Sequence, residues 1–309
     1  MTRTVIIAIG AGAASAFVFL GTNVENFGAL ILGYLAPMPL FLVGLSLGSV
    51  AGIIAALAGV GTTLVTAGLA FAAVYTMLSA APAALVVRQS LLSRADSQGN
   101  IEWYPAGLLV TWLCGIGAAV FAAAALAMSG EAGGMEGWIR ESLTTVLGQI
   151  MPEESARIAD IFAPNMPAIM VASWVLMMTF NGALSQGLLV RFGRNARPSP
   201  DLAELEVPNW VLYAVVAALV VATLGSGGFA FVGRNLVMIF AMPFFFQGLA
   251  VIHAMARRTQ AKTLALIITY MLLLFVFWSA IVVVALGLVE QVARLRQRFA
   301  GPPQDQEEE

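Results

Sequence analysis

The side chains that could do chemistry in this chain are few and widely spread. It has one cysteine, Cys114, and one histidine, His253. The carboxylates avoid the centres of the apolar segments, and Glu25 is the one nearest to any expected membrane pocket. No His-Glu-x-x-His, Gly-x-Ser-x-Gly or Walker-type glycine loop occurs. We therefore expect no catalytic residue, no metal site and no cofactor, and the sequence does not indicate an enzyme.

The elements that must carry these side chains are membrane helices. Residues 26–87 contain no charged residue and no histidine. Only 10% of the whole chain is charged, against about 25% in soluble domains, and the mean hydropathy is +0.89. A bilayer core takes roughly 20 apolar residues per helix. The sequence predicts an all-α, polytopic transmembrane bundle forming a single integral membrane domain over 1–300, with a disordered acidic tail over 301–309.

Nine apolar segments are candidate spans, and the first is expected to be an uncleaved helix rather than a signal peptide. They cover residues 4–21, 27–45, 47–66, 68–90, 104–128, 166–190, 208–227, 235–255 and 263–289. Basic residues in short loops indicate the cytoplasmic face, and most of the arginine clusters agree. The last segment is basic at both ends, so one segment is expected not to cross fully. The suspects are the first segment and 235–255, which Pro243 interrupts, and eight spans are preferred to nine.

Between two of these spans, residues 129–165 form an extracytoplasmic insert. Apolar residues recur at helical spacing from Met135 to Ile150, with polar residues between them. We expect a helical hairpin that lies in the membrane interface with its apolar face in lipid. The alternative is a lid over an external pocket.

Two backbone features stand out inside the charge-free stretch. Pro37 and Pro39 lie one residue apart and remove two backbone donors, which breaks a helix. Broken helices at membrane depth can line a binding site, although the prolines can also mark the end of a span. Beyond them, Gly44, Gly48 and Gly52 recur every fourth residue, a spacing that favours close helix packing.

Polar side chains within the spans are the remaining candidates. Asn181, Asn235 and Gln247 lie in apolar segments, where polar groups face the bundle rather than lipid. Such residues commonly form hydrogen bonds between helices. They are therefore either packing contacts or lining residues of a ligand site.

Several ordered motifs together resemble a known family. They are Tyr34-Leu35-Ala36-Pro37-Met38-Pro39, Asn181-Gly182-Ala183-Leu184, Arg197-Pro198-Ser199-Pro200-Asp201, Val207-Pro208-Asn209-Trp210, Asn235, Phe246-Gln247-Gly248-Leu249 and Gly287-Leu288-Val289-Glu290. The chain resembles the YybS-like family of predicted bacterial membrane proteins. That family is a domain of unknown function, distantly similar to the S components of energy-coupling-factor vitamin transporters. The resemblance implies a multi-pass protein of the bacterial inner membrane.

Two functions follow as hypotheses. The first is an S-component-like, transport-associated subunit that binds a small molecule. Its site would draw on the following residues: Glu25, Pro37, Pro39, Asn181, Asn235 and Gln247. The second is a non-catalytic assembly or scaffold factor that acts through helix packing and basic cytoplasmic loops. The expected partners are the lipid bilayer, a second membrane protein and a small-molecule ligand, but not nucleic acid.

Overall fold

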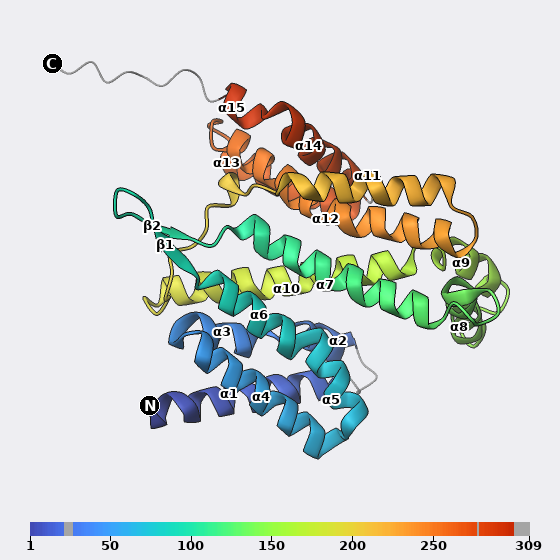
Figure 1. Ribbon diagram of the computed structural model, residues 1–309, viewed down its shortest axis with the longest axis horizontal. Helices are drawn as coiled ribbons and strands as arrows, with labels where there is room; N and C mark the ends of the chain where they lie inside the picture. The colour runs from blue at the N-terminus through green and yellow to red at the C-terminus, as the bar shows by residue number, and fades with distance from the viewer. Residues whose placement is uncertain (22–26, 277, 300–309) are drawn as a thin grey trace. The chain divides into compact units, whose positions relative to one another are not determined.

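A computed structural model describes residues 1–21, 27–276 and 278–299, and these are predominantly helical (Figure 1). Glu25 and the tail 301–309 lie outside the described residues. The apolar helices are α1 (Thr2–Leu20), α2 (Phe27–Tyr34), α3 (Met38–Leu47), α4 (Ser49–Ala67), α5 (Leu69–Tyr75), α6 (Ala81–Ser90), α7 (Ala106–Ala127), α10 (Met166–Arg191), α11 (Asn209–Leu224), α12 (Gly228–Ala256), α13 (Lys262–Phe275) and α14 (Ser279–Ala293).

Shorter elements connect these helices. A π-helical turn, η2 (Thr76–Ala80), joins α5 to α6, and a hairpin of two strands, β1 (Ser93–Ala95) and β2 (Ile101–Trp103), follows α6. The insert contains α8 (Gly134–Gly148) and α9 (Ser155–Phe162). A 3-10 turn, η3 (Leu202–Glu204), precedes α11, and α15 (Leu295–Phe299) follows α14.

The chain divides into two compact units. Unit 1 comprises residues 1–113 and 173–200, and unit 2 comprises residues 114–172 and 201–309. The boundaries fall inside α7 and α10, so both helices continue from one unit into the other.

Unit 1 is packed through very small residues. At Gly12 of α1, an added Cβ would collide with the backbone of Ala55 and Gly59 in α4. The flanking Ala8 and Ala16 are fully buried. Backbones can approach this closely only where the side chains are absent or tiny, and such contacts are typical of membrane helices.

The three glycines at four-residue spacing do not lie on one helix. Gly44 belongs to α3 and faces Val87 of α6, whereas Gly52 belongs to α4 and faces Gly44. Gly48 forms the corner between α3 and α4, with φ of +100°. Its left-handed backbone, which is strained for residues with a side chain, gives it the role of a turn residue.

Unit 2 is built around α12. This helix packs against α11 at Gly233, which meets the backbone of Ala222. It packs against α14 where Gly248 approaches Val283 and Gly287 approaches Phe244. Pro243 lies inside α12, which nevertheless continues from Gly228 to Ala256.

The apolar segment predicted over 263–289 is two helices. α13 has 14 residues and α14 has 15, so each is about 21–23 Å long. That is shorter than a hydrocarbon core of about 30 Å. The last predicted segment is thus divided, whereas 235–255, one of the two suspects for incomplete crossing, lies within the single continuous helix α12.

Six helices in the described part of the chain are long and apolar enough to cross a membrane. They are Thr2–Leu20, Ser49–Ala67, Leu69–Ser90, Ala106–Ala127, Met166–Arg191 and Gly228–Ala256. Four shorter apolar helical segments accompany them, namely Ile31–Leu47, α11, α13 and α14. The chain is thus an all-α, polytopic membrane protein, as the composition predicted.

Candidate functional site

The helix break predicted at the two prolines exists and lies in unit 1. α2 ends at Tyr34 and α3 begins at Met38. Across the break, the Met38 amide donates to the Leu35 carbonyl at 3.0 Å, and the Leu40 amide donates to the Pro37 carbonyl at 3.1 Å. These shifted bonds deprive the Tyr34 and Ala36 carbonyls of their usual helical donors.

Side chains from distant helices take the place of those donors. Asn181 Nδ2 of α10 donates to the Tyr34 carbonyl at 2.7 Å, and Ser15 Oγ of α1 donates to the Ala36 carbonyl at 2.6 Å. Ser15 Oγ also shares a hydrogen bond of 2.7 Å with Tyr75 Oη. Ser15, Tyr75 and Asn181 are all fully buried. These buried hydrogen bonds therefore fix the backbone geometry of the break.

Asn181 has one polar atom left over. Its Nδ2 uses both protons, on the Tyr34 carbonyl and on the Met177 carbonyl at 2.8 Å. Its Oδ1 is buried and meets no donor among the described residues. A buried acceptor without a donor costs about 1–3 kcal/mol, so an added donor bound at this atom would be stabilised.

A second interrupted helix in unit 1 also has a side-chain donor in place of a missing main-chain amide. Pro82 lacks the amide that would reach the Leu78 carbonyl in an α-helix. Trp174 Nε1 of α10 donates to that carbonyl at 2.8 Å. Trp174 and Asn181 are seven residues apart, which places them on the same face of α10 two turns apart. One face of α10 therefore satisfies both interrupted helices.

The other predicted amides lie in unit 2 and have different surroundings. Asn235 Oδ1 accepts from the Ala168 amide at 2.9 Å, and its Nδ2 donates to the Pro164 and Phe231 carbonyls at 2.9 Å each. It thereby links the start of α10 to α12. Gln247 is 3% exposed, and its Oε1 meets no donor among the described residues.

The structure thus brings together Pro37, Pro39 and Asn181, whereas Asn235 and Gln247 lie about 18 Å apart along α12. Sequence reasoning missed three partners at the interrupted helices: Ser15, Tyr75 and Trp174. The sequence contained a pattern that could have found them, because isolated polar groups within apolar segments face the bundle.

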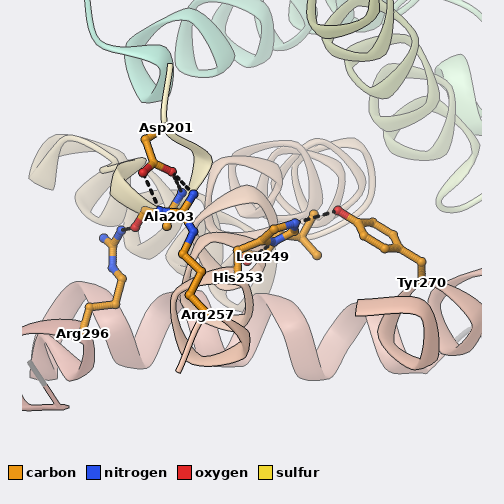
Figure 2. A network of polar contacts seen from close by, with 7 residues as sticks. All are labelled: Asp201, Ala203, Leu249, His253, Arg257, Tyr270 and Arg296. Atoms are coloured by element: carbon orange, nitrogen blue, oxygen red, sulfur yellow. Dashed lines mark hydrogen bonds and ion pairs between the residues drawn. The ribbon is translucent and has the colours of Figure 1, made fainter. Parts of the chain in front are cut away.

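A polar cluster in unit 2 joins the ends of three segments (Figure 2). Arg257, just after α12, forms two bonds of 2.5 Å with the Asp201 carboxylate, and this pairing lowers the pKa of Asp201. Arg296, after α14, donates to the Ala203 carbonyl at 2.5 Å and to Glu290 at 2.8 Å. A carboxylate with a lowered pKa is a weak base, so this cluster is suited to anchoring.

The same cluster fixes the direction of the last two helices. Asp201 and Ala203 are two residues apart, and they bind residues at the ends of α12 and α14 respectively. α13 starts six residues after α12 ends. The beginning of α13 and the end of α14 therefore lie near one loop, and α13 with α14 forms a hairpin.

Arg197, in the loop after α10, is buried, with 6% of its surface exposed. Its Nη1 donates to the Ser90 carbonyl at 2.7 Å and to the Tyr104 carbonyl at 3.3 Å, and its guanidinium lies 5.6 Å from the centre of the Trp103 ring. Burial lowers the pKa of Arg197. In unit 1 this arginine therefore anchors the loop after α10 to the end of α6 and to the segment that follows β2.

The insert in unit 2 is a helical pair, as predicted. Arg140 of α8 forms ion pairs with Asp160 of α9 and, at 3.2 Å, with Glu136. Glu136 also lies 3.5 Å from Arg234 of α12. Large apolar side chains of the pair are exposed, namely Trp138, Val146, Ile150, Ile161 and Phe162. Their exposure agrees with the interfacial interpretation.

Among the described residues, no group of three or more His, Cys, Asp or Glu side chains could hold a metal ion. A shallow hollow of about 420 Å³ lies along α13 in unit 2. None of its lining residues is among the six predicted ligand contacts.

Comparison with known proteins gives a family and no closer relative. No curated protein and no solved structure matches the chain. The profile of one family, described as a predicted membrane protein, matches residues 13–290, which is most of the chain. Together with the apolar helical architecture, this match shows that the chain belongs to the DUF2232 family of predicted membrane proteins.

Proposed function

We propose that this protein is a non-catalytic, multi-pass protein of the bacterial cytoplasmic membrane that binds a small uncharged molecule at the α2–α3 break. The observation that carries the proposal is Asn181 Oδ1, a fully buried acceptor that meets no donor among the residues the structure describes and lies beside a broken helix. The ligand would supply a hydroxyl or amine proton to this atom. Buried polar groups are normally paired, so the unpaired oxygen favours a molecule that completes the site.

The surroundings of the break suit a neutral ligand. The nearby groups are carbonyls, hydroxyls and an amide, contributed by Ser15, Tyr34, Tyr75 and Asn181. Residues 26–87 supply no charge. Broken helices serve as binding sites in transporters, and the resemblance to S components points in the same direction. A transport-associated role is therefore preferred to catalysis.

Native mass spectrometry of the gently purified protein tests this proposal. The wild type should retain a small molecule that Asn181→Leu loses. Gln247→Leu is the matched control, because Gln247 is also a buried amide with an unpaired oxygen and lies in unit 2. It should retain the molecule. Circular dichroism of each variant checks the fold, and Ser15→Ala serves as a milder second variant at the break.

A wild type that carries no molecule, or an Asn181→Leu variant that folds and still carries it, would contradict the binding proposal. Equal loss from Asn181→Leu and Gln247→Leu would also contradict it, because the effect would then not be specific to the break.

A scaffold or assembly role is the second candidate. The observation that favours it is the β1–β2 hairpin, whose strand residues are largely exposed, with Ile101 65% exposed. Each strand has one neighbour in the described two-stranded sheet, and an unpaired strand edge can pair with another chain. Photocrosslinking from residue 101 in cells would capture a protein partner under this hypothesis and none under ligand binding alone.

A further inference from the structure

We propose that the exposed face of α13 binds an anionic phospholipid, with the headgroup at Lys262 and an acyl chain in the hollow along the helix. This inference concerns unit 2 and does not depend on the proposed ligand of unit 1. It starts from α13, a helix with no buried residue.

The hollow runs along one side of α13. Its lining residues recur three and four positions apart and so form one stripe of α13: Thr263, Leu266, Ile267, Tyr270, Met271 and Leu274. From Thr263 to Leu274 the stripe rises about 16 Å. Nearly all of the lining is apolar, and because α13 alone supplies the lining residues, the hollow is open along its length.

The positive charge at one end of the hollow favours an anionic headgroup. Lys262 is exposed and begins α13 beside Thr263. No acidic residue occurs between Glu206 and Glu290. The nearby carboxylate of Asp201 is already paired with Arg257. A basic residue next to an anionic lipid surface contributes about 1 kcal/mol to binding.

The hairpin places Lys262 at the polar end of the apolar stripe. The start of α13 and the end of α14 both lie at the polar cluster, and α13 is too short to cross a hydrocarbon core. The apolar stripe of α13 therefore leads from a basic polar surface into the membrane. Tyr270, which lines the hollow, also points its hydroxyl at His253 of α12, 3.4 Å away (Figure 2). A phospholipid likewise has a charged headgroup at one end and apolar acyl chains at the other.

Native mass spectrometry with two competing lipids tests the proposal. The full-length protein in detergent is given equal amounts of phosphatidylglycerol and phosphatidylcholine with identical acyl chains. The wild type should retain more phosphatidylglycerol, and Lys262→Gln should reduce that preference about fivefold. Arg191→Gln, an exposed basic residue at the end of α10, should leave the preference unchanged.

A second pair of variants tests the hollow. Ile267→Trp should fill it and lower the retention of both lipids, whereas Ile281→Trp, on the exposed surface of α14, should not. The proposal is overturned if the wild type shows no headgroup preference or if Lys262→Gln behaves like Arg191→Gln. It is also overturned if Ile267→Trp has no effect, or if this face instead holds a second copy of the chain.

Discussion

At the scale of residues, the notable feature is the use of side chains to repair interrupted helices. Ser15, Trp174 and Asn181 each donate to a main-chain carbonyl of another helix. In a bilayer such carbonyls have no water to bond, so each would be costly if left unpaired. The repairs allow irregular backbone to persist within the apolar part of unit 1.

Trp174 provides the sharpest test of this idea. Trp174→Phe should lower the free energy of unfolding by about 1–3 kcal/mol, because it leaves the Leu78 carbonyl unpaired. The loss should be smaller in a Pro82→Ala background, where the restored amide can reach Leu78. Unfolding in mixed detergent measures both.

The control for this comparison of Trp174→Phe in the two backgrounds is Trp112→Phe. It removes only a hydrogen bond to the Tyr104 hydroxyl. Its cost should not depend on Pro82. Additive effects of Trp174→Phe and Pro82→Ala would show that the indole does not substitute for the missing amide.

At the scale of elements, close backbone contact sets which helices can pair. α1 carries two glycines with opposite surroundings: Gly12 meets the backbone of α4, while nothing lies within 4 Å of a Cβ added at Gly10. The contrast separates the packing role of glycine from its low helix propensity, because both residues lie in one helix.

We expect Gly12→Ala to destabilise the protein by about 1–3 kcal/mol through overpacking. Gly10→Ala should be neutral or stabilising by up to about 1 kcal/mol, because alanine favours the helix. Thermal unfolding of the two variants measures the difference. Equal effects would mean that α1 and α4 do not approach at Gly12.

At the scale of the whole molecule, we propose that the α13–α14 hairpin enters and leaves the membrane by one face, which would account for the charge pattern of this segment. Both ends of the apolar segment 263–289 are basic. A helix that crosses once would place one set of basic residues outside, against the positive-inside rule. A hairpin that enters and leaves by the same face keeps both sets together.

Cysteine labelling in intact cells tests this topology. In a Cys114→Ala background, Ala261→Cys and Gln297→Cys should be protected together from an impermeant reagent. Gly130→Cys, in the loop between α7 and α8, should react. Labelling of Gln297→Cys from outside would show that α13 and α14 cross the membrane as one span.

The sequence by itself determined the membrane location, the helical class and the break at Pro37 and Pro39. These follow from composition and from local backbone chemistry, which need no partner. The amphipathic insert was predictable for the same reason. Most span boundaries also lie within a few residues of the helix ends, but 27–45 is divided between α2 and α3, α12 begins seven residues before 235, and 263–289 is two helices.

Only the tertiary structure decided which groups meet. Asn181 and the Tyr34 carbonyl are separated by 147 residues, and Ser15 and Tyr75 by 60. Apolar periodicity cannot specify such pairs, because lipid-facing and helix-facing positions are equally apolar. The burial of Arg197 has the same origin, because it depends on hydrogen bonds to the carbonyls of Ser90 and Tyr104, which are distant in the chain.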